Sequence, residues 1–378
     1  MDVVLAVGGS SWEAAAIREI KSSDSLRLVR RCVDVADLLA VAGTDLATAA
    51  LVSADLVGLD ADTVHRLERN NIRVVAIESE AEHSRALGIH RFARLGRLDV
   101  LARDVSSRAA PADNQPRTPL LAVWGPAGSP GRSTVALSIA ASAAAQDVDT
   151  ILVDADTYGG SLGQSLSVLD DVSGLVAACR AANTGRAAEV TEQLLVIGER
   201  LRLLTGLPRA DMWPQVRTGA LELVLERLRA ESGLLVADCG FCLEPGDRNQ
   251  TTLQVLDEAD VVVVVGQPDP VGLARLVRGL HDLVETFPGQ VPTVVLNQAR
   301  ASLAWGERDI NSTLHRLTGI APVVHLPHDQ PALDLAAVSG RSPREVAPSS
   351  PFVARIEVLT QGLVSQAART SVLAPSVR

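Results

Sequence analysis

Residues Leu120 to Ala140 read LLAVWGPAGSPGRSTVALSIA, and this stretch decides the fold. A short apolar strand runs into glycine-rich sequence and then into an alanine-rich helix, which is the pattern of a phosphate-binding loop. Such a loop works because glycines let backbone N–H groups curl around a phosphate, while the start of the helix adds positive potential. A basic side chain reaches the outer phosphates, and a hydroxyl holds magnesium. These parts would be supplied by Gly125, Gly128, Gly131, Arg132 and Ser133, with Thr134 beside them.

The loop departs from the usual pattern in its spacing and in its charge. Five residues separate its first glycine from its last, one more than in the pattern G-x-x-x-x-G-K-[S/T]. Lys21 is the only lysine in the chain, so Arg132 must carry the phosphate charge, although its planar fork is not interchangeable with a compact ammonium. Pro126 and Pro130 also lack N–H donors. We predict nucleotide binding with inefficient hydrolysis; the alternative is a Gly/Pro turn that binds no ligand.

The length and composition describe an acidic, foldable protein of two domains. The chain has 378 residues, of which 47% are hydrophobic and 21% are charged. Its formal net charge of −10 argues against non-specific binding of DNA, and its 2% aromatic content argues against base-stacking platforms. The first ten residues lack a basic leader pattern, and no apolar run has the length of a membrane-spanning helix. We therefore expect a cytoplasmic protein.

Residues 1–104 alternate strand-like and helix-like patterns. This order predicts a parallel sheet with helices on both faces, and in size and order the segment resembles a response-regulator receiver domain. The expected strands are Val3–Val7, Leu26–Val29, Ala49–Val52 and Val74–Ile77, and the expected helices are Trp12–Ile20, Val35–Val41, Asp62–Arg69 and Leu98–Arg103.

The acidic chemistry of a receiver is missing from this segment. A receiver needs an acidic pair after its first strand, but residues 7–9 are Val, Gly and Gly. Asp55 lies near the position of a phospho-acceptor and Ser79 follows the fourth strand, but Lys21 is too far along the chain to serve as the fifth-strand lysine. We interpret Asp55 as a solvated loop carboxylate. The segment is predicted to be a docking or dimerisation module that is not phosphorylated.

Residues 105–118 have the Ser, Ala, Pro and polar content of a linker, and a second α/β segment follows over residues 119–345. Its apolar runs predict about seven or eight parallel strands joined by right-handed crossovers. Residues 346–378 are expected to form a helix over Pro351–Ala368, packed on the body or on a partner, and a disordered tail over 371–378. The other elements expected in this segment are strands at Thr150–Asp156, Leu201–Leu204, Leu234–Asp238, Asp260–Gly266, Pro292–Asn297 and Pro322–Leu326, and helices at Ser133–Ala145, Trp213–Glu231, Pro270–Glu285 and Glu307–Leu317.

Three carboxylates follow buried strands of the second segment. Asp154 and Asp156 end the strand after the loop helix, and because side chains two residues apart share a face of a strand, both can point beyond its carboxyl edge. Ligands of open α/β sheets bind at this edge. Asp238 ends a later strand, from which it could reach the same magnesium ion as Ser133. The alternative is that Asp154 and Asp156 are solvated turn residues.

Cys239 and Cys242 form a C-x-x-C pair, which is typical of zinc and redox sites. No second cysteine pair or nearby histidine completes a set of zinc ligands, and thioredoxin-type sites lie at the start of a helix early in the fold. We therefore interpret the two cysteines as small apolar side chains that fill space beside the predicted site.

The loop, the D-x-D after the second strand and the segments LLVADCG, VVLNQ and LPHDQPALDLA together resemble the MinD/ParA superfamily of dimeric ATPases. A receiver-like segment joined to such an ATPase is similar to the CpaE/TadZ proteins of Tad (Flp) pilus assembly. The segments WGPAGSPGRST, DCGFCLE and DPVGLARL resemble actinobacterial members, which are often labelled septum-site-determining proteins. This resemblance implies an α/β fold with a parallel-sheet P-loop ATPase domain after a smaller receiver-like domain.

The resemblance also implies ATP and Mg²⁺ as cofactors. Ser133 and Asp238 would hold the magnesium ion. Asn297 and the loop that contains Pro327 would line the adenine. The residues that would hold the phosphates are Gly128, Ser129, Gly131, Arg132, Ser133 and Thr134.

For catalysis, the resemblance assigns Asp156 the role of orienting the attacking water, with Asp154 in its shell and Arg132 on the phosphates. The superfamily has a second lysine early in the loop that acts across the dimer. The corresponding place is occupied by Pro126 or Ala127, so dimer-activated hydrolysis is expected to be slow.

Two functions remain open at this point. In the first, ATP joins two subunits into a homodimer that recruits pilus-assembly or septal proteins, and the protein reaches the pole, the septum or the inner face of the membrane through these partners. In the second, the chain is a scaffold that has lost turnover and acts by protein–protein interaction. A DNA segregation factor is disfavoured by the acidic balance.

Overall fold

The computed structural model describes residues 1–42, 44, 46–103, 117–128, 130–168, 172–303 and 305–373. These residues form two compact units. One unit contains the described residues up to Arg103 together with Cys179–Val190 and Arg217–Val224, and the other contains the rest. Ser129 and most of the predicted linker lie outside the described residues, so the linker stays a prediction.

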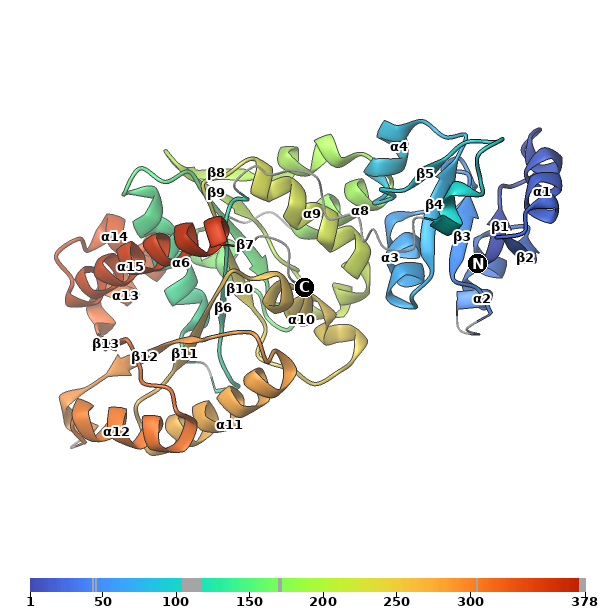
Figure 1. Cartoon of the computed structure of the whole chain (residues 1–378). Coiled ribbons are helices and arrows are strands. Elements are labelled where there is room, and N and C mark those ends of the chain that lie inside the picture. The colour runs from blue at the N-terminus through green and yellow to red at the C-terminus, as the bar shows by residue number, and fades with distance from the viewer. Residues whose placement is uncertain are drawn as a thin grey trace. The chain divides into compact units, whose positions relative to one another are not determined.

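The first unit contains a sheet of five parallel strands in the order β2-β1-β3-β4-β5 (Figure 1). This is the flavodoxin-like doubly wound order, in which helices cover both faces. The strands are β1 (Asp2–Ala6), β2 (Arg27–Cys32), β3 (Ala49–Val52), β4 (Arg73–Ile77) and β5 (Phe92–Ala93), and the helices are α1 (Glu13–Ser22), α2 (Val35–Ala42), α3 (Ala61–Arg69), α4 (Ala81–Ala86) and α5 (Val100–Arg103).

Both faces of this sheet are buried, as the sequence predicts. Val3 and Leu5 of β1 belong to one buried cluster, whereas Val4 and Ala6 belong to another. Because successive side chains of a strand point to opposite faces, the two clusters are the two covered faces of one sheet. The helix α4 and the short strand β5 were not predicted.

The second unit contains a sheet of eight strands, with β6 near its centre between β11 and β10 (Figure 1). Each described pair is parallel except β8–β9, which is antiparallel, so the prediction of an all-parallel sheet is wrong at this edge. In order across the sheet, the strands are β13 (Val324–Pro327), β12 (Thr293–Ala299), β11 (Val261–Gly266), β6 (Leu120–Trp124), β10 (Leu234–Cys239), β7 (Thr150–Ala155), β9 (Leu201–Leu204) and β8 (Leu195–Gly198).

Helices join these strands. The α-helices after residue 117 are α6 (Arg132–Ala144), α7 (Leu162–Ser165), α8 (Gly174–Asn183), α9 (Thr218–Ala230), α10 (Gln250–Glu258), α11 (Pro270–Thr286), α12 (Glu307–Thr318), α13 (Gln330–Ser339), α14 (Pro343–Val346) and α15 (Pro351–Leu373). Short 3-10 helices lie at Ala187–Gln193, Ala210–Gln215, Asp247–Asn249 and Ala301–Leu303.

The C-terminal helix α15 packs on α6, the helix that follows the predicted phosphate loop (Figure 1). Phe352, Ile356, Leu359 and Leu363 of α15 are buried at helical spacing in the same cluster as the apolar residues of α6. Of the two predicted surfaces, the body or a partner, the structure thus shows this helix on the body. It continues to Leu373, so the expected disorder is wrong for residues 371–373, and residues 374–378 lie outside the described chain.

The long helix predicted over Trp213–Glu231 is two elements. Ala210–Gln215 is a 3-10 helix that contains Pro214, and α9 begins only at Thr218. Val216 lies between them in an extended conformation. Pro214 was expected in the first turn of one long helix, but it lies in the short 3-10 helix that precedes α9.

No helix among the described residues combines the length and the apolar character that crossing a membrane requires.

Candidate functional site

The predicted phosphate loop connects the central strand β6 to α6, with tight packing at its glycines. A Cβ atom on Gly125 would lie 2.3 Å from the carbonyl oxygen of Val265, at the end of the neighbouring strand. Gly131 precedes α6 with a φ of 87°, and a Cβ there would lie 2.4 Å from Nδ2 of Asn297. Glycine is therefore required at both positions. At Gly125 a side chain has no space, and at Gly131 the backbone conformation also favours glycine.

Arg132 is the first residue of α6, and its side chain turns into the loop. Nη1 donates to the carbonyl oxygens of Gly125, at 3.0 Å, and Pro126, at 3.5 Å. Nη2 lies 3.4 Å from Oδ2 of Asp156. The arginine side chain is only 13% exposed and that of Asp156 is 8% exposed. The structure thus places the predicted phosphate cation and one predicted catalytic carboxylate side by side at the carboxyl edge of the sheet.

Asp156 is held by the turn that follows β7. Its Oδ1 accepts hydrogen bonds from the backbone N–H of Tyr158, at 2.8 Å, and of Gly159, at 3.4 Å. A Cβ on Gly240, after the adjacent strand β10, would come within 3.2 Å of the same oxygen. The carboxylate therefore has a fixed orientation, with Oδ2 directed to Arg132.

Asp154 is buried deeper in the same strand. Its oxygens accept from the N–H groups of Leu162, at 3.1 Å, and Asp156, at 3.4 Å. Gly160 and Gly206 crowd it, since a Cβ on either would lie under 3 Å from the carboxylate. Burial raises the pKa of Asp154 to about 7, and the charge of Asp156 adds to the rise. This environment contradicts the alternative that Asp154 is a solvated turn residue.

Asp238 is the last residue but one of β10, and it pairs in register with Asp154. It is fully buried, and neither carboxylate oxygen has a hydrogen-bond partner among the described residues. Burial raises the pKa of Asp238 well above its usual range, and the charge of Asp154 raises it further. Ser133 and Arg132 act in the opposite direction, although the Ser133 hydroxyl does not reach full hydrogen-bond geometry.

An unpartnered, buried carboxylate is costly unless a cation binds it. Asp238 and the half-buried Ser133, in the first turn of α6, are oxygen ligands of the kind that Mg²⁺ prefers, and water and phosphate usually complete its coordination. The residues present therefore fit a magnesium ion. No cluster of three or more His, Cys, Asp and Glu side chains suited to a metal occurs in the described part of the chain.

The residues predicted to line the adenine are not brought into one cavity. Asn297 is buried and donates from Nδ2 to the carbonyl oxygen of Pro130, at 2.8 Å, so it holds the loop. Pro327 instead lines a cavity of about 550 Å³ together with Pro268, Arg300 and Trp305. Asn297 is not among the described residues that line this cavity.

The cysteines of the C-x-x-C pair, Cys239 and Cys242, differ in burial. Cys239 is buried, and burial raises the pKa of its thiol. The sulfur of Cys242 accepts from Nδ2 of Asn249, at 3.2 Å. Both are free thiols, and their interpretation as small space-filling side chains stays a prediction.

Sequence reasoning missed a small cluster beside Asp156. The hydroxyl of Tyr158 donates to Oδ1 of Asn249, at 2.7 Å, and the guanidinium of Arg248 lies 3.9 Å from the centre of the Tyr158 ring. Tyr158 is the only tyrosine in the chain, which was the available signal. The cluster ties the turn after β7 to the segment after β10.

In the first unit, Asp55 and Ser79 are the residues that the receiver resemblance places near a phosphorylation site. Asp55 is exposed directly after β3, as expected for a solvated carboxylate. The Ser79 hydroxyl donates to the carbonyl oxygen of Ile77 and accepts from the N–H of Ala54, each at 3.0 Å.

No family model matches the sequence, and no curated protein matches it either. Solved structures resemble the fold. A ParA family ATPase of Chlorobium tepidum is 18% identical, with a TM-score of 0.58 over 65% of this chain and 99% of that chain. The septum site-determining protein MinD of Pyrococcus horikoshii, complexed with Mg-ADP, is 16% identical, with a TM-score of 0.54 over 67% and 98%.

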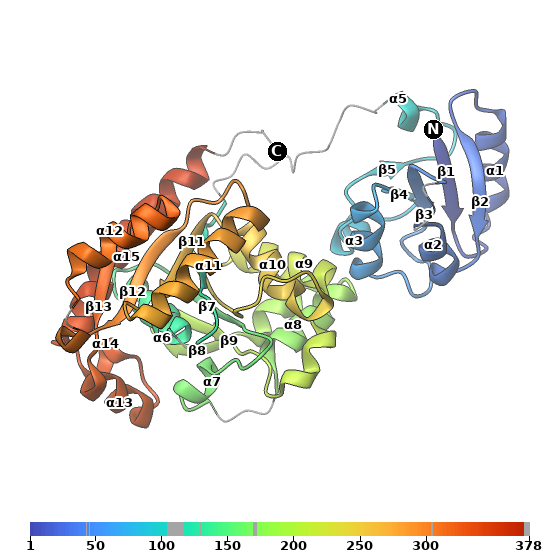
Figure 2. The same cartoon turned by 90° about the horizontal axis from the view of Figure 1, so that it is seen from below.

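A chain of the MinC:MinD cell division complex from Aquifex aeolicus is 16% identical, with a TM-score of 0.50 over 69% of this chain and 98% of that chain. At these identities the likeness concerns the fold. This likeness, together with the two sheets of the structure, confirms the predicted α/β class, with a larger, mostly parallel sheet and a separate, smaller parallel sheet (Figure 2). The unit that contains the larger sheet has the fold of these MinD and ParA ATPase structures.

Proposed function

We propose that the protein binds ATP with Mg²⁺, hydrolyses it slowly and uses the bound state to position other proteins. The observation that carries this proposal is the contact between Arg132 and Asp156 across the loop, with the unpartnered carboxylate of Asp238 behind it. A polyphosphate with magnesium binds to a cation, an oriented carboxylate and an oxygen ligand for the metal. Arg132, Asp156 and Asp238 would supply these three groups at the edge of the parallel sheet.

In this proposal the backbone of the loop and the start of α6 hold the phosphates. The loop residues are Gly128, Ser129, Gly131, Arg132, Ser133 and Thr134. Ser133 and Asp238 would hold the magnesium ion, and a bound ion would supply positive charge to the phosphates. Asn297 would fix the loop through its hydrogen bond to the carbonyl oxygen of Pro130.

Slow hydrolysis would follow from the contacts that Arg132 makes within the loop. Asp156 would accept a proton from a water and orient it toward the terminal phosphate, with Asp154 behind it. The guanidinium of Arg132 already donates to two loop carbonyls and to Asp156, so its charge is divided among several acceptors. Pro126 and Pro130 supply no N–H donors to a phosphate.

The positioning role rests on the fold and on the resemblance of the motifs. The MinD of P. horikoshii is complexed with Mg-ADP, and the Aquifex protein is part of a MinC:MinD complex. By analogy, this chain would form an ATP-dependent homodimer of the CpaE/TadZ type that recruits pilus-assembly or septal proteins. Its first sheet, in flavodoxin-like order, would be a receiver-like docking module.

The same proposal sets the place of action. The protein would be cytoplasmic and would reach the pole, the septum or the inner face of the membrane through its partners. A net charge of −10 disfavours nucleic acid as the partner.

A second candidate is a scaffold without turnover. The observation that favours it is that Arg132 is already satisfied by the Gly125 carbonyl, the Pro126 carbonyl and Asp156 without a ligand. Such an arginine could serve only to close the loop. The protein would then localise its partners through a constitutive dimer.

Light scattering separates the two candidates. With Mg²⁺ and a non-hydrolysable β,γ-imido analogue of ATP, the molar mass should rise from that of the 39.7 kDa chain to twice that value, and Arg132→Ala should stay monomeric. A mass of twice the chain mass with and without nucleotide, in both proteins, would support the scaffold instead, and a monomer mass throughout would contradict both candidates.

A further inference from the structure

The phosphate loop is contacted by a second arginine, from a helix far along the chain. Arg275 lies in α11, and its guanidinium is placed where a side chain of Gly128 would be. A Cβ on Gly128 would lie 2.1 Å from Nη1 of Arg275 and 3.0 Å from its Cζ. Gly128 also has a φ of 116°, a conformation that favours glycine. The loop therefore has a glycine at a position where this guanidinium lies against it.

The fold holds α11 in this position. The helix follows β11, which pairs directly with β6, the strand that leads into the loop. Asp269 caps its first turn by accepting from the N–H groups of Val271 and Gly272, at 3.1 and 3.0 Å. One turn beyond Arg275, a Cβ on Gly279 would lie 3.0 Å from the Trp124 ring. The backbone of α11 thus rests closely against the end of β6.

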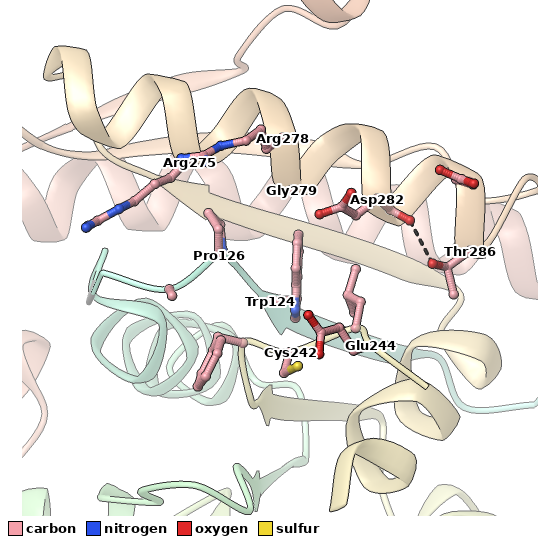
Figure 3. Close-up of a pocket in the computed structure, with 13 residues that line it drawn as sticks. Trp124, Pro126, Cys242, Glu244, Arg275, Arg278, Gly279, Asp282 and Thr286 are labelled. Carbon is pink, nitrogen blue, oxygen red and sulfur yellow. Dashed lines mark hydrogen bonds between the residues drawn. The ribbon is translucent and has the colours of Figure 1, made fainter. Parts of the chain in front are cut away.

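The side chain of Arg275 is exposed, and it makes no hydrogen bond or ion pair with the residues that the structure describes. It lines a cavity of about 550 Å³ together with Pro126, Ala127 and Arg278 (Figure 3). In that view Arg275 reaches from α11 across the loop, whereas Arg278 stays beside its own helix and donates to the carbonyl oxygen of Ala274.

A bound triphosphate calls for a cation besides Arg132. Asp156 already lies at the loop, and Arg132 divides its hydrogen bonds among the loop carbonyls and Asp156. A triphosphate would bring further negative charge to this place. Phosphate oxygens are bound best by a planar guanidinium that can donate two parallel hydrogen bonds. Arg275 has such a guanidinium, and it lies beside the loop.

We infer that Arg275 is a second phosphate-binding cation, supplied by the same subunit, which contacts the terminal phosphate of a bound nucleoside triphosphate. This inference rests on the proposed nucleotide binding and adds to it selectivity for the triphosphate over the diphosphate. A cation on the Pro126 side of the loop would contact the phosphate that ADP lacks.

Calorimetric titration tests the inference with two ligands, each with Mg²⁺: the β,γ-imido analogue of ATP, and ADP. Arg275→Gln should weaken binding of the triphosphate about tenfold to a hundredfold, the effect of losing a charge-assisted pair, and should change ADP binding less than about twofold. Arg275→Lys should retain a large part of the affinity. Arg278→Gln, the matched control on the same helix, should bind both ligands like the wild type.

The outcomes separate the inference from the proposed function. If the wild type binds the triphosphate and Arg275→Gln binds it equally well or more tightly, the inference is wrong while nucleotide binding stands. An equal loss for triphosphate and diphosphate would mean that Arg275 supports the loop in general, which also contradicts it. If the wild type binds neither ligand, the proposed function fails and the inference fails with it. Thermal unfolding without nucleotide checks that each variant is folded.

Discussion

Nη2 of Arg132 lies 3.4 Å from Oδ2 of Asp156, and this contact joins the first turn of α6 to the turn after β7. Both side chains are almost fully buried. The pair connects the group that would bind phosphate to the group that would orient water. Its two members can therefore be separated by mutation, since one should control binding and the other turnover.

Asp156→Asn should lower the rate of ATP hydrolysis by at least about tenfold, because an amide cannot accept the proton of the attacking water. Binding of Mg·ATP should be retained, since the amide oxygen can still accept from the N–H of Tyr158. Phosphate release and calorimetry measure the two effects. Asp147→Asn, at a carboxylate that is 91% exposed, is the control. A hydrolysis rate unchanged by Asp156→Asn would remove Asp156 from catalysis.

Gly128→Ala should reduce the affinity for Mg·ATP by about tenfold or more. The new methyl group would meet the guanidinium of Arg275, and the φ of 116° would strain an alanine by about 1–3 kcal/mol. Gly362→Ala, where a Cβ would meet nothing within 4 Å, is the matched control and should bind like the wild type. Equal affinities for both variants would show that the loop does not hold nucleotide in the described conformation.

Asp154 should make the unfolding of the nucleotide-free protein depend on pH. Its pKa is raised from 3.8 to about 7, so the native state holds this proton more tightly than the unfolded chain does. The stabilising contribution is present below about pH 4 and is lost as the pH rises toward 7. The free energy of unfolding of Asp154→Asn, minus that of the wild type, should therefore increase over this range, by on the order of 2–4 kcal/mol.

Urea unfolding at several pH values measures this difference. We expect the variant to be less stable than the wild type at low pH, because the two oxygens of Asp154 accept from Leu162 and Asp156, whereas an amide has only one acceptor oxygen. Only the change with pH carries the test. A difference that stays constant from pH 4 to pH 8 would mean that Asp154 is ionised normally in the native state.

Phe352→Ala should lower the free energy of unfolding by about 3–5 kcal/mol, the usual cost of removing a large buried ring. Phe352 is fully buried in the cluster that joins α15 to α6. Val358→Ala on the same helix, at a side chain that is 69% exposed, should change it by less than about 0.5 kcal/mol. Equal effects of both changes in urea unfolding would contradict the packing of α15 on the body.

Much of the site was readable from local sequence. Arg132 follows a glycine turn, and Asp154, Asp156 and Asp238 each end an apolar run, so a parallel sheet brings them to one edge. Arg275 could not be found in this way. Its approach to the loop depends on β11 lying next to β6, and the order of strands in a sheet is not the order of strands in the chain.

The errors in the fold also have local causes. The strand β8 alternates half-buried and exposed residues, with Val196 77% exposed, so it lacks the continuous apolar run that marks the other strands. It joins β9 through a tight connection and therefore runs antiparallel to it. The helical spacing after Trp213 extends across Val216, but the extended backbone there interrupts the helix. Periodicity alone does not show such a break.

The central claim is that Arg132 binds the phosphates of a nucleotide, and calorimetric titration of the nucleotide-free protein with ATP and Mg²⁺ tests it most directly. Arg278→Ala, which changes an arginine of α11 outside the loop, is the control for loss of charge. The wild type and Arg278→Ala should bind ATP with one saturable site, and Arg132→Ala should show no saturable heat. No heat in the wild type, or equal binding by Arg132→Ala, would contradict the account.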